Sequence, residues 1–275
     1  KISNGKWIWW SRGIGGRSAL DYLIKVKGYS FLEAVETIIG HTAIQAPVYE
    51  KPQAKEENKP LLLPEKCVSN RVITEYLFGR GIDFEIINYC ISNDLIFESL
   101  PYHNVVFVGY DEKKEPKYAA YRSTNKRRIM GDCSGSKKDY SFRLGKENLE
   151  EVHLFECAID LLSYATLAKL NGQDWKEMSF VSLSGVYSPA KKIEDSKVPI
   201  ALEKYLGSNP SVRKIRIHFD NDIAGRKAAQ TLKTILPDKY EIVDEPPKAG
   251  KDFNDFLCMR MGIYNKKTHE RNEER

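Results

Sequence analysis

The sequence has few cysteines, and their spacing matches neither a zinc site nor a disulfide framework. Its 275 residues include five cysteines, at positions 67, 90, 133, 157 and 258. No C-x-x-C pair occurs among them. The five histidines, at 41, 103, 153, 218 and 269, are scattered and are interpreted as surface or satisfied core residues. We therefore expect no zinc, and a reducing, cytoplasmic setting.

Long hydrophobic runs are also missing. No apolar stretch approaches the roughly 20 residues that span a bilayer, and residues 1–10 lack the pattern of a signal peptide. We therefore expect no membrane association. Hydrophobic residues make up 41% of the chain, enough for a core in each of two modest domains. The first residue is Lys1 and not Met, which leaves a longer parent chain open.

Acidic residues are scarce in one stretch of the chain. From Lys113 to Lys146 there are eleven Lys and Arg residues against three Asp and Glu, a local net charge of +8, whereas the whole chain carries +5. The remainder therefore sums to −3. Such a block indicates a polyanionic partner, most commonly nucleic acid, although a solvated strand-and-loop face has the same composition.

Composition and periodicity divide the chain into five parts. A compact N-terminal unit precedes a linker rich in Pro and charge, then a small α+β subdomain with the basic block, an α/β domain and a charged tail. Their expected bounds are 1–44, 45–66, 67–150, 151–262 and 263–275. In the first part, Lys6 to Trp10 predicts a strand, and helices are expected from Ser18 and from Ser30, where Glu33 completes a capping box.

Strands and helices alternate in the α/β domain, which predicts a parallel sheet with helices on both faces. The smaller subdomain should hold two helices, at 69–80 and 83–89, and strands at 105–108, 118–122 and 140–144. In the α/β domain the expected strands are 152–155, 178–183, 214–219 and 240–243, and the expected helices are 158–170, 199–206, 223–236 and 253–261.

Acidic residues follow the ends of these strands. Glu156 comes directly after the first strand and Asp160 one helical turn later, Asp220 and Asp222 follow the third strand, and Asp252 follows Gly250-Lys251. Open sheets of this class place their sites at the carboxyl ends of the strands. Crowded carboxylates repel one another, and Mg²⁺ with its oxygen ligands relieves that cost. Asp160, Asp222 and Asp255 could instead serve as helix caps or dipole partners.

Three motifs carry a resemblance to a known fold. Phe155-Glu-Cys-Ala-Ile-Asp160, Phe219-Asp-Asn-Asp-Ile-Ala-Gly225 and Gly250-Lys-Asp-Phe-Asn-Asp255 resemble the acidic motifs of the TOPRIM domain of bacterial-type primases and topoisomerases. The resemblance implies Mg²⁺ or Mn²⁺ held by Glu156, Asp160, Asp220, Asp222, Asp252 and Asn254, with Glu156, Asp220 and Asp222 acting in catalysis. It covers about 110 residues.

A second resemblance lies upstream. Glu75-Tyr-Leu-Phe-Gly-Arg-Gly-Ile82 is similar to the segment that opens the catalytic core of bacterial DNA primases. It implies contacts to nucleic acid or nucleotide phosphates from Arg80, Arg122, Lys126, Arg127, Arg128, Lys137, Lys138 and Lys251. Residues 5–40 look like the back half of a primase zinc-binding domain without its ligands, which implies a zinc-free remnant.

The sequence departs from this family at two site positions. Cys157 stands where the family usually has Gly, and Asn254, a poorer metal ligand, where it usually has Asp. The resemblance implies a small primase of the kind found in phages or mobile elements, acting on single-stranded DNA and nucleoside triphosphates. A replicative helicase, or another replication protein of the element, would be a further partner. A TOPRIM nuclease and a non-catalytic nucleic-acid-binding protein stay open as alternatives.

Overall fold

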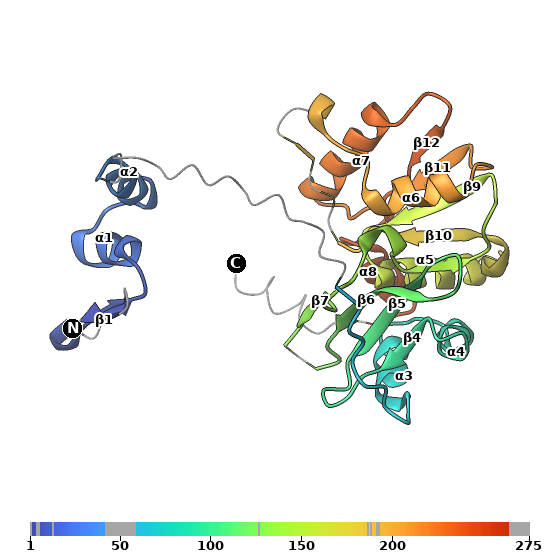
Figure 1. Cartoon of the computed structure of the whole chain (residues 1–275), viewed down its shortest axis with the longest axis horizontal. Coiled ribbons are helices and arrows are strands. Elements are labelled where there is room, and N and C mark those ends of the chain that lie inside the picture. The colour runs from blue at the N-terminus through green and yellow to red at the C-terminus, as the bar shows by residue number, and fades with distance from the viewer. Residues whose placement is uncertain are drawn as a thin grey trace. The chain divides into compact units, whose positions relative to one another are not determined.

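The chain forms two compact units, Lys1–Glu57 and Asn58–Arg275. The structure is a computed structural model, and it describes residues 2–3, 6–12, 14–41, 59–125, 127–185, 187, 189–190 and 193–263 (Figure 1). Most of the expected linker (45–58), Lys126 and the charged tail from residue 264 onward lie outside the described residues.

The first unit is a small antiparallel sheet followed by two helices. Its elements are β1 (Ile2–Ser3), β2 (Lys6–Trp9), β3 (Ile14–Gly16), α1 (Ala19–Lys27) and α2 (Phe31–His41). Ser18 caps α1 through the backbone N–H of Asp21. Ser30 and Glu33 bond to each other's backbone N–H, which confirms the predicted capping box. The interpretation of this unit as a zinc-free remnant stays a prediction.

The second unit begins with an antiparallel sheet, ordered β4-β5-β6-β7, that carries two helices. Its elements are α3 (Arg71–Phe78), α4 (Phe84–Ser92), β4 (Ile96–Glu98), β5 (Val105–Tyr110), β6 (Pro116–Arg122) and β7 (Met130–Asp132). Both helices and the two long strands match the expectation. Strands β4 and β7 were not expected, because three residues are too few to show an alternating pattern.

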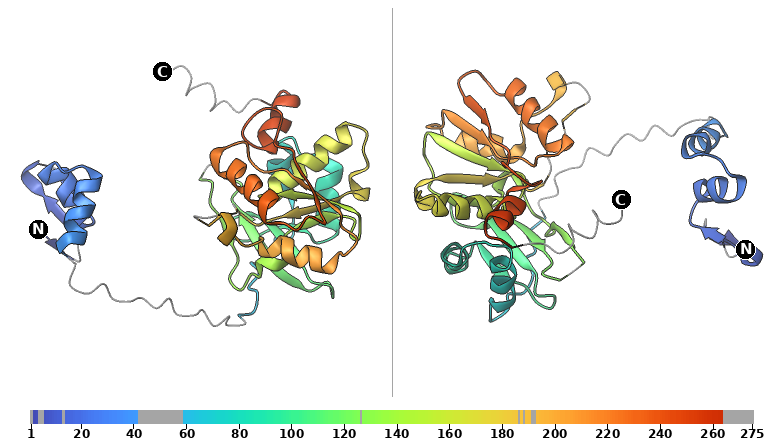
Figure 2. Two further views of the ribbon diagram at one scale, coloured as in Figure 1. Left: turned by 90° about the horizontal axis from the view of Figure 1, so that it is seen from above. Right: turned by 180° about the vertical axis from the view of Figure 1, so that it is seen from behind.

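The rest of this unit is a five-stranded sheet, ordered β12-β11-β9-β10-β8, in which all neighbours are parallel except β10 and β8. Its strands are β8 (Arg143–Gly145), β9 (Glu151–Phe155), β10 (Ser179–Ser182), β11 (Lys214–Ile217) and β12 (Glu241–Asp244). Its helices are α5 (Ala158–Leu170), α6 (Ile200–Ser208), α7 (Ile223–Ile235) and α8 (Phe253–Arg260). Figure 2 shows helices on both sides of this sheet, which confirms the predicted fold class.

The strand expected at 140–144 belongs to a different sheet from the one foreseen. Lys138–Tyr140 is a 3₁₀ turn, and β8 starts at Arg143 and pairs antiparallel with β10, so that Arg143 lies opposite Val181. The pairing moves β8 from the basic subdomain to the edge of the five-stranded sheet. Backbone hydrogen bonds therefore join β8 to the five-stranded sheet directly after the basic subdomain.

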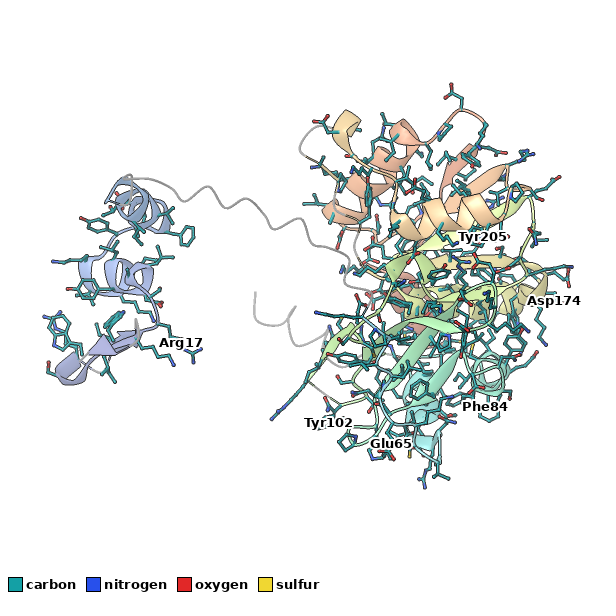
Figure 3. The ribbon with its side chains drawn as sticks, in the orientation of Figure 1. Arg17, Glu65, Phe84, Tyr102, Asp174 and Tyr205 are labelled. Carbon is teal, nitrogen blue, oxygen red and sulfur yellow. The ribbon has the colours of Figure 1, made fainter. Side chains whose placement is uncertain are left out.

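Two hydrophobic cores hold the five-stranded sheet in place. One fills the face under α5 and α8 and continues to α3 and α4, and the other fills the face under α6 and α7. In Figure 3, Tyr205 of α6 lies by the five-stranded sheet, and Tyr102 lies at the far end of the antiparallel sheet. Both faces of the sheet are thus covered, and its carboxyl edge is where the acidic residues emerge.

The two histidines within the five-stranded sheet are satisfied core residues, as expected. His153 and His218 are 4% and 1% exposed, and their rings stack with Nδ1 of His153 2.9 Å from Nε2 of His218. His218 Nδ1 lies 3.1 Å from the carbonyl oxygen of Glu245. Burial lowers the pKa of His218 well below its ordinary value.

Candidate active site

Three loops bring acidic residues to the carboxyl edge of the five-stranded sheet. Glu156 follows β9, Asp220 and Asp222 lie between β11 and α7, and Asp252 lies between β12 and α8. Because β9, β11 and β12 are parallel neighbours, their ends face the same side. The structure therefore places the predicted acidic motifs together at this edge.

Glu156 and Asp220 are in direct contact. The backbone N–H of Asp220 donates to Oε1 of Glu156 at 3.2 Å, and the Glu156 side chain is buried. Burial, together with the charges of Asp220 and Asp222, raises the pKa of Glu156 to about 7. Gly225 makes this approach possible, because a Cβ there would lie 2.2 Å from the Asp220 carbonyl oxygen.

Asp222 has two roles, one on each carboxylate oxygen. Oδ1 caps α7 by accepting the backbone N–H of Gly225 at 2.9 Å, and this bond is the main reason that the pKa of Asp222 is lowered. Oδ2 lies 3.3 Å from the ammonium of Lys251, which also lies 3.1 Å from Oδ2 of Asp220. The capping interpretation is thus correct for Asp222, and one oxygen is left to face the site.

Asp160, Asp252 and Asn254 form a neighbouring group at the starts of α5 and α8. Oδ2 of Asp160 accepts the Cys157 thiol at 2.8 Å, and Oδ1 accepts the backbone N–H of Asn254 at 3.2 Å. Burial and the charge of Asp252 raise the pKa of Asp160 to about 7. Asp252 caps α8 through the backbone N–H of Asp255 at 2.7 Å.

Asn254 makes structural contacts in this arrangement. It is 2% exposed, and its side-chain amide nitrogen donates to the carbonyl oxygen of Arg80 at 2.9 Å and to Oγ of Ser163 at 3.0 Å. Both amide protons are therefore committed to neighbouring elements. The side chain fixes α8 against α5 and the α3–α4 turn, and any role of its carbonyl oxygen as a metal ligand stays a prediction.

Arg226 braces the Asp220 loop and was not foreseen from the sequence. Its guanidinium donates to the carbonyl oxygens of Phe219 at 2.8 Å and Asp220 at 3.2 Å, and to Oδ1 of Asp244 at 2.7 Å. The sequence does contain a signal for this role, because Arg226 lies four residues after Asp222, one helical turn beyond the N-cap of α7. Asp244, the last residue of β12, is a further acidic strand end and was not among the predicted site residues.

The donor set at this edge fits a hard divalent cation. Carboxylate oxygens are the ligands that Mg²⁺ and Mn²⁺ prefer, and two buried carboxyls with raised pKa values leave unbalanced negative charge when ionised. The carboxylates at this edge do not surround a single point. Among the described residues, three ligand atoms from His, Cys, Asp or Glu come within 4.8 Å of one another in a different cluster, formed by Cys67, Glu98 and His103.

Contacts within the protein account for that second cluster. Oε2 of buried Glu98 accepts the backbone N–H groups of Val72 and Ile73 at 2.9 and 3.3 Å, and Oε1 lies 2.5 Å from Nδ1 of His103. Both carboxylate oxygens are thus engaged. They hold the first turn of α3 against β4, so we assign this cluster a structural role.

Two of the basic candidates share a contact near the acidic site. Nε of Arg122 donates to the Tyr76 hydroxyl at 3.3 Å, and Nη1 of Arg80 lies 3.5 Å from the same oxygen. Arg80 adjoins α8, because its carbonyl oxygen accepts the Asn254 amide. Two of the predicted phosphate-binding arginines, Arg80 and Arg122, therefore lie side by side, next to the acidic site.

The remaining basic candidates lie farther along β6, β7 and the following turn. Arg127 and Arg128 are exposed on the β6–β7 turn. Lys138 donates to the carbonyl oxygen of Ser184 at 3.3 Å and pairs with Asp132 at 3.1 Å. Gly185, next to Ser184, donates its N–H to the carbonyl oxygen of Glu156 at 2.9 Å. Lys137 is exposed beside Lys138, and Lys126 lies outside the described residues.

Comparison with known families agrees with this geometry. Residues 153–257 match the family model described as "Toprim-like". These residues form a Toprim-like domain. They include β10, β11, β12 and most of β9, but not β8. They also contain every acidic residue that was predicted to belong to the site. Residues 75–148, which span the basic block, match a family described as "Protein of unknown function (DUF3991)". No curated protein matches the sequence.

Solved primase structures show a distant likeness to much of this chain. The primase fragment of the bacteriophage T7 primase-helicase protein is 18% identical, with a TM-score of 0.45 over 70% of this chain and 72% of that one. The Aquifex aeolicus primase (zinc-binding and RNA polymerase domains) is 15% identical, with a TM-score of 0.43 over 94% and 71%. The E. coli primase catalytic core is 12% identical, with a TM-score of 0.44 over 70% of each chain. At TM-scores below 0.5 these similarities do not extend to activity.

In the part of the chain that the structure describes, no helix combines the length and apolar character needed to cross a membrane.

Proposed function

We propose that this protein is a primase-type nucleotidyltransferase that extends a 3′-hydroxyl on a single-stranded DNA template with nucleoside triphosphates. The observation that carries the proposal is the convergence of Glu156, Asp220 and Asp222 at the carboxyl edge of the Toprim-like domain. The basic residues that approach this edge from the neighbouring subdomain support nucleic acid as the substrate.

Mg²⁺ or Mn²⁺ would be held by Glu156, Asp220, Asp222 and Asp252, with Asp160 behind them. Such a metal neutralises phosphate charge and lowers the pKa of an attacking hydroxyl. The protein's own part is to hold these carboxylates in position. Helix capping fixes Asp222 and Asp252, the backbone bond from Asp220 fixes Glu156, and Arg226 fixes the loop between β11 and α7.

The basic residues would orient the nucleic acid toward the acidic edge. Arg127 and Arg128 are exposed on the β6–β7 turn. Arg122 of β6 and Arg80 beside α8 both contact the Tyr76 hydroxyl. These positive side chains would bind the phosphates of a template strand, so the affinity for DNA should fall steeply as the salt concentration rises. A replicative helicase, or another replication protein of a mobile element, stays a predicted partner.

The test compares primer synthesis by the parent protein and by a double variant of the acidic edge. Asp220→Asn with Asp222→Asn removes two charges, and Asn is as good a helix cap as Asp, so α7 should still form. The parent protein should make short labelled oligomers from labelled nucleoside triphosphates on single-stranded DNA with Mg²⁺ or Mn²⁺, and the double variant should not. Shortened DNA would instead favour a Toprim-like nuclease, and salt-sensitive binding without either product would favour a binding protein.

A further inference from the structure

The ammonium of Lys251 directly contacts two carboxylates at the acidic edge. Its ammonium lies 3.1 Å from Oδ2 of Asp220 and 3.3 Å from Oδ2 of Asp222, so that one positive charge bridges two negative ones. The Asp220 side chain is 17% exposed and the Asp222 side chain 39%, whereas that of Lys251 is 57% exposed. The lysine therefore covers the pair from the solvent side.

The backbone of Lys251 is fastened to the same motif. Its carbonyl oxygen accepts the N–H of Asn221, the residue between Asp220 and Asp222, at 2.7 Å. Gly250, with φ of 78°, makes the turn that delivers it. The main chain of Lys251 is thus held beside the acidic pair, while its four-carbon stem and ammonium stay free to turn toward solvent.

A divalent cation and the Lys251 ammonium would compete for the same oxygens. A metal held by Asp220 and Asp222 would compete with Lys251 for these carboxylates, and two cations at one carboxylate pair would repel each other. Lys251 would then have to give up its contacts with the pair. Its ammonium would stay tethered beside the acidic edge by the main chain, within reach of the phosphates of a triphosphate bound there.

We propose that Lys251 is an exchangeable internal cation: it neutralises Asp220 and Asp222 before a metal binds, yields them to the metal, and then contacts a phosphate of the bound nucleotide. This inference rests on the proposed metal site of the Toprim-like domain. It gives Lys251 two opposed effects, because the same charge hinders metal binding and favours triphosphate binding.

The test measures both affinities on the full chain by calorimetry at pH 8. Lys251→Met should bind Mn²⁺ about 3- to 10-fold more tightly than the parent, the size expected for loss of two partly exposed charge contacts. With Mn²⁺ saturating, it should bind a non-cleavable nucleoside triphosphate analogue several-fold more weakly. Lys251→Arg keeps the charge and should bind Mn²⁺ like the parent.

Lys248→Met is the matched control, since Lys248 is exposed on the same loop and forms no ion pair with the acidic group among the described residues. It should change neither affinity. The inference is overturned if Lys251→Met binds Mn²⁺ no more tightly than the parent, if its triphosphate affinity does not fall, or if neither protein binds Mn²⁺. Lys251→Gln repeats the measurement should the Met variant fold poorly. If both affinities change as expected but the parent protein makes no primers, the result would contradict the proposed function. It would still support the exchange of Lys251 for the metal.

Discussion

Replacing Gly225 by Ala should disturb the acidic edge, because the added methyl group has no room there. A Cβ at Gly225 would lie 2.2 Å from the carbonyl oxygen of Asp220 and 3.0 Å from Oε1 of Glu156. Ordinary contacts are about 3.5 Å, so the Asp220 loop must move by about 1 Å. Overpacking of this kind costs about 1–3 kcal/mol, against a gain in helix propensity of at most about 1 kcal/mol.

The assay is urea denaturation followed by circular dichroism, paired with Mn²⁺ calorimetry. Gly207→Ala is the control, because a Cβ at this exposed position in α6 meets nothing within 4 Å. Gly207→Ala should stabilise the protein by up to about 1 kcal/mol, and Gly225→Ala should destabilise it by about 1–2 kcal/mol and weaken Mn²⁺ binding. A Gly225→Ala protein as stable as Gly207→Ala, with unchanged Mn²⁺ affinity, would refute the close packing of this loop.

Three further outcomes follow from the site. Arg226→Met should lose about 1–3 kcal/mol of stability and weaken Mn²⁺ binding, because three hydrogen bonds disappear, while exposed Lys227→Met should do neither. Folding raises the pKa of Glu156 from 4.5 to about 7, so the stability of the metal-free protein should fall as pH rises from about 4.5 to 7, whereas Mn²⁺ affinity should rise; a pH series of denaturation and calorimetry checks both. Arg127→Ala with Arg128→Ala should reduce the salt dependence of single-stranded DNA binding by about two phosphate contacts, measured by fluorescence anisotropy.

The acidic strand ends could be predicted because the signals are local. Alternating strands and helices imply a parallel sheet, and such a sheet gathers its carboxyl ends at one edge. Glu156, Asp220 and Asp252 each lie in the loop between a strand and the next helix, at or within two residues of the N-cap of that helix. The double role of Asp222, as cap and as site residue, also follows from its position just before α7.

Contacts between loops far apart in the sequence could not be predicted. The bond from Asn221 to Lys251 joins loops 30 residues apart, and nothing in either local pattern signals it. Strand β8 has three residues, and its pairing with β10 is set by the tertiary fold rather than by its own composition. Likewise, the basic block indicated a charged surface, but it could not show that Arg122 meets Arg80 at the Tyr76 hydroxyl.

The most direct test of the central claim is primer synthesis on single-stranded DNA with labelled nucleoside triphosphates and Mg²⁺ or Mn²⁺. We predict short labelled oligomers from the parent protein and from an Asp238→Asn control, whose exposed carboxylate lies after α7, and none from Asp220→Asn with Asp222→Asn. Equal synthesis by the double variant, or no synthesis by a parent protein that binds both Mn²⁺ and DNA, would contradict the assignment of a nucleotidyltransferase site to this acidic edge.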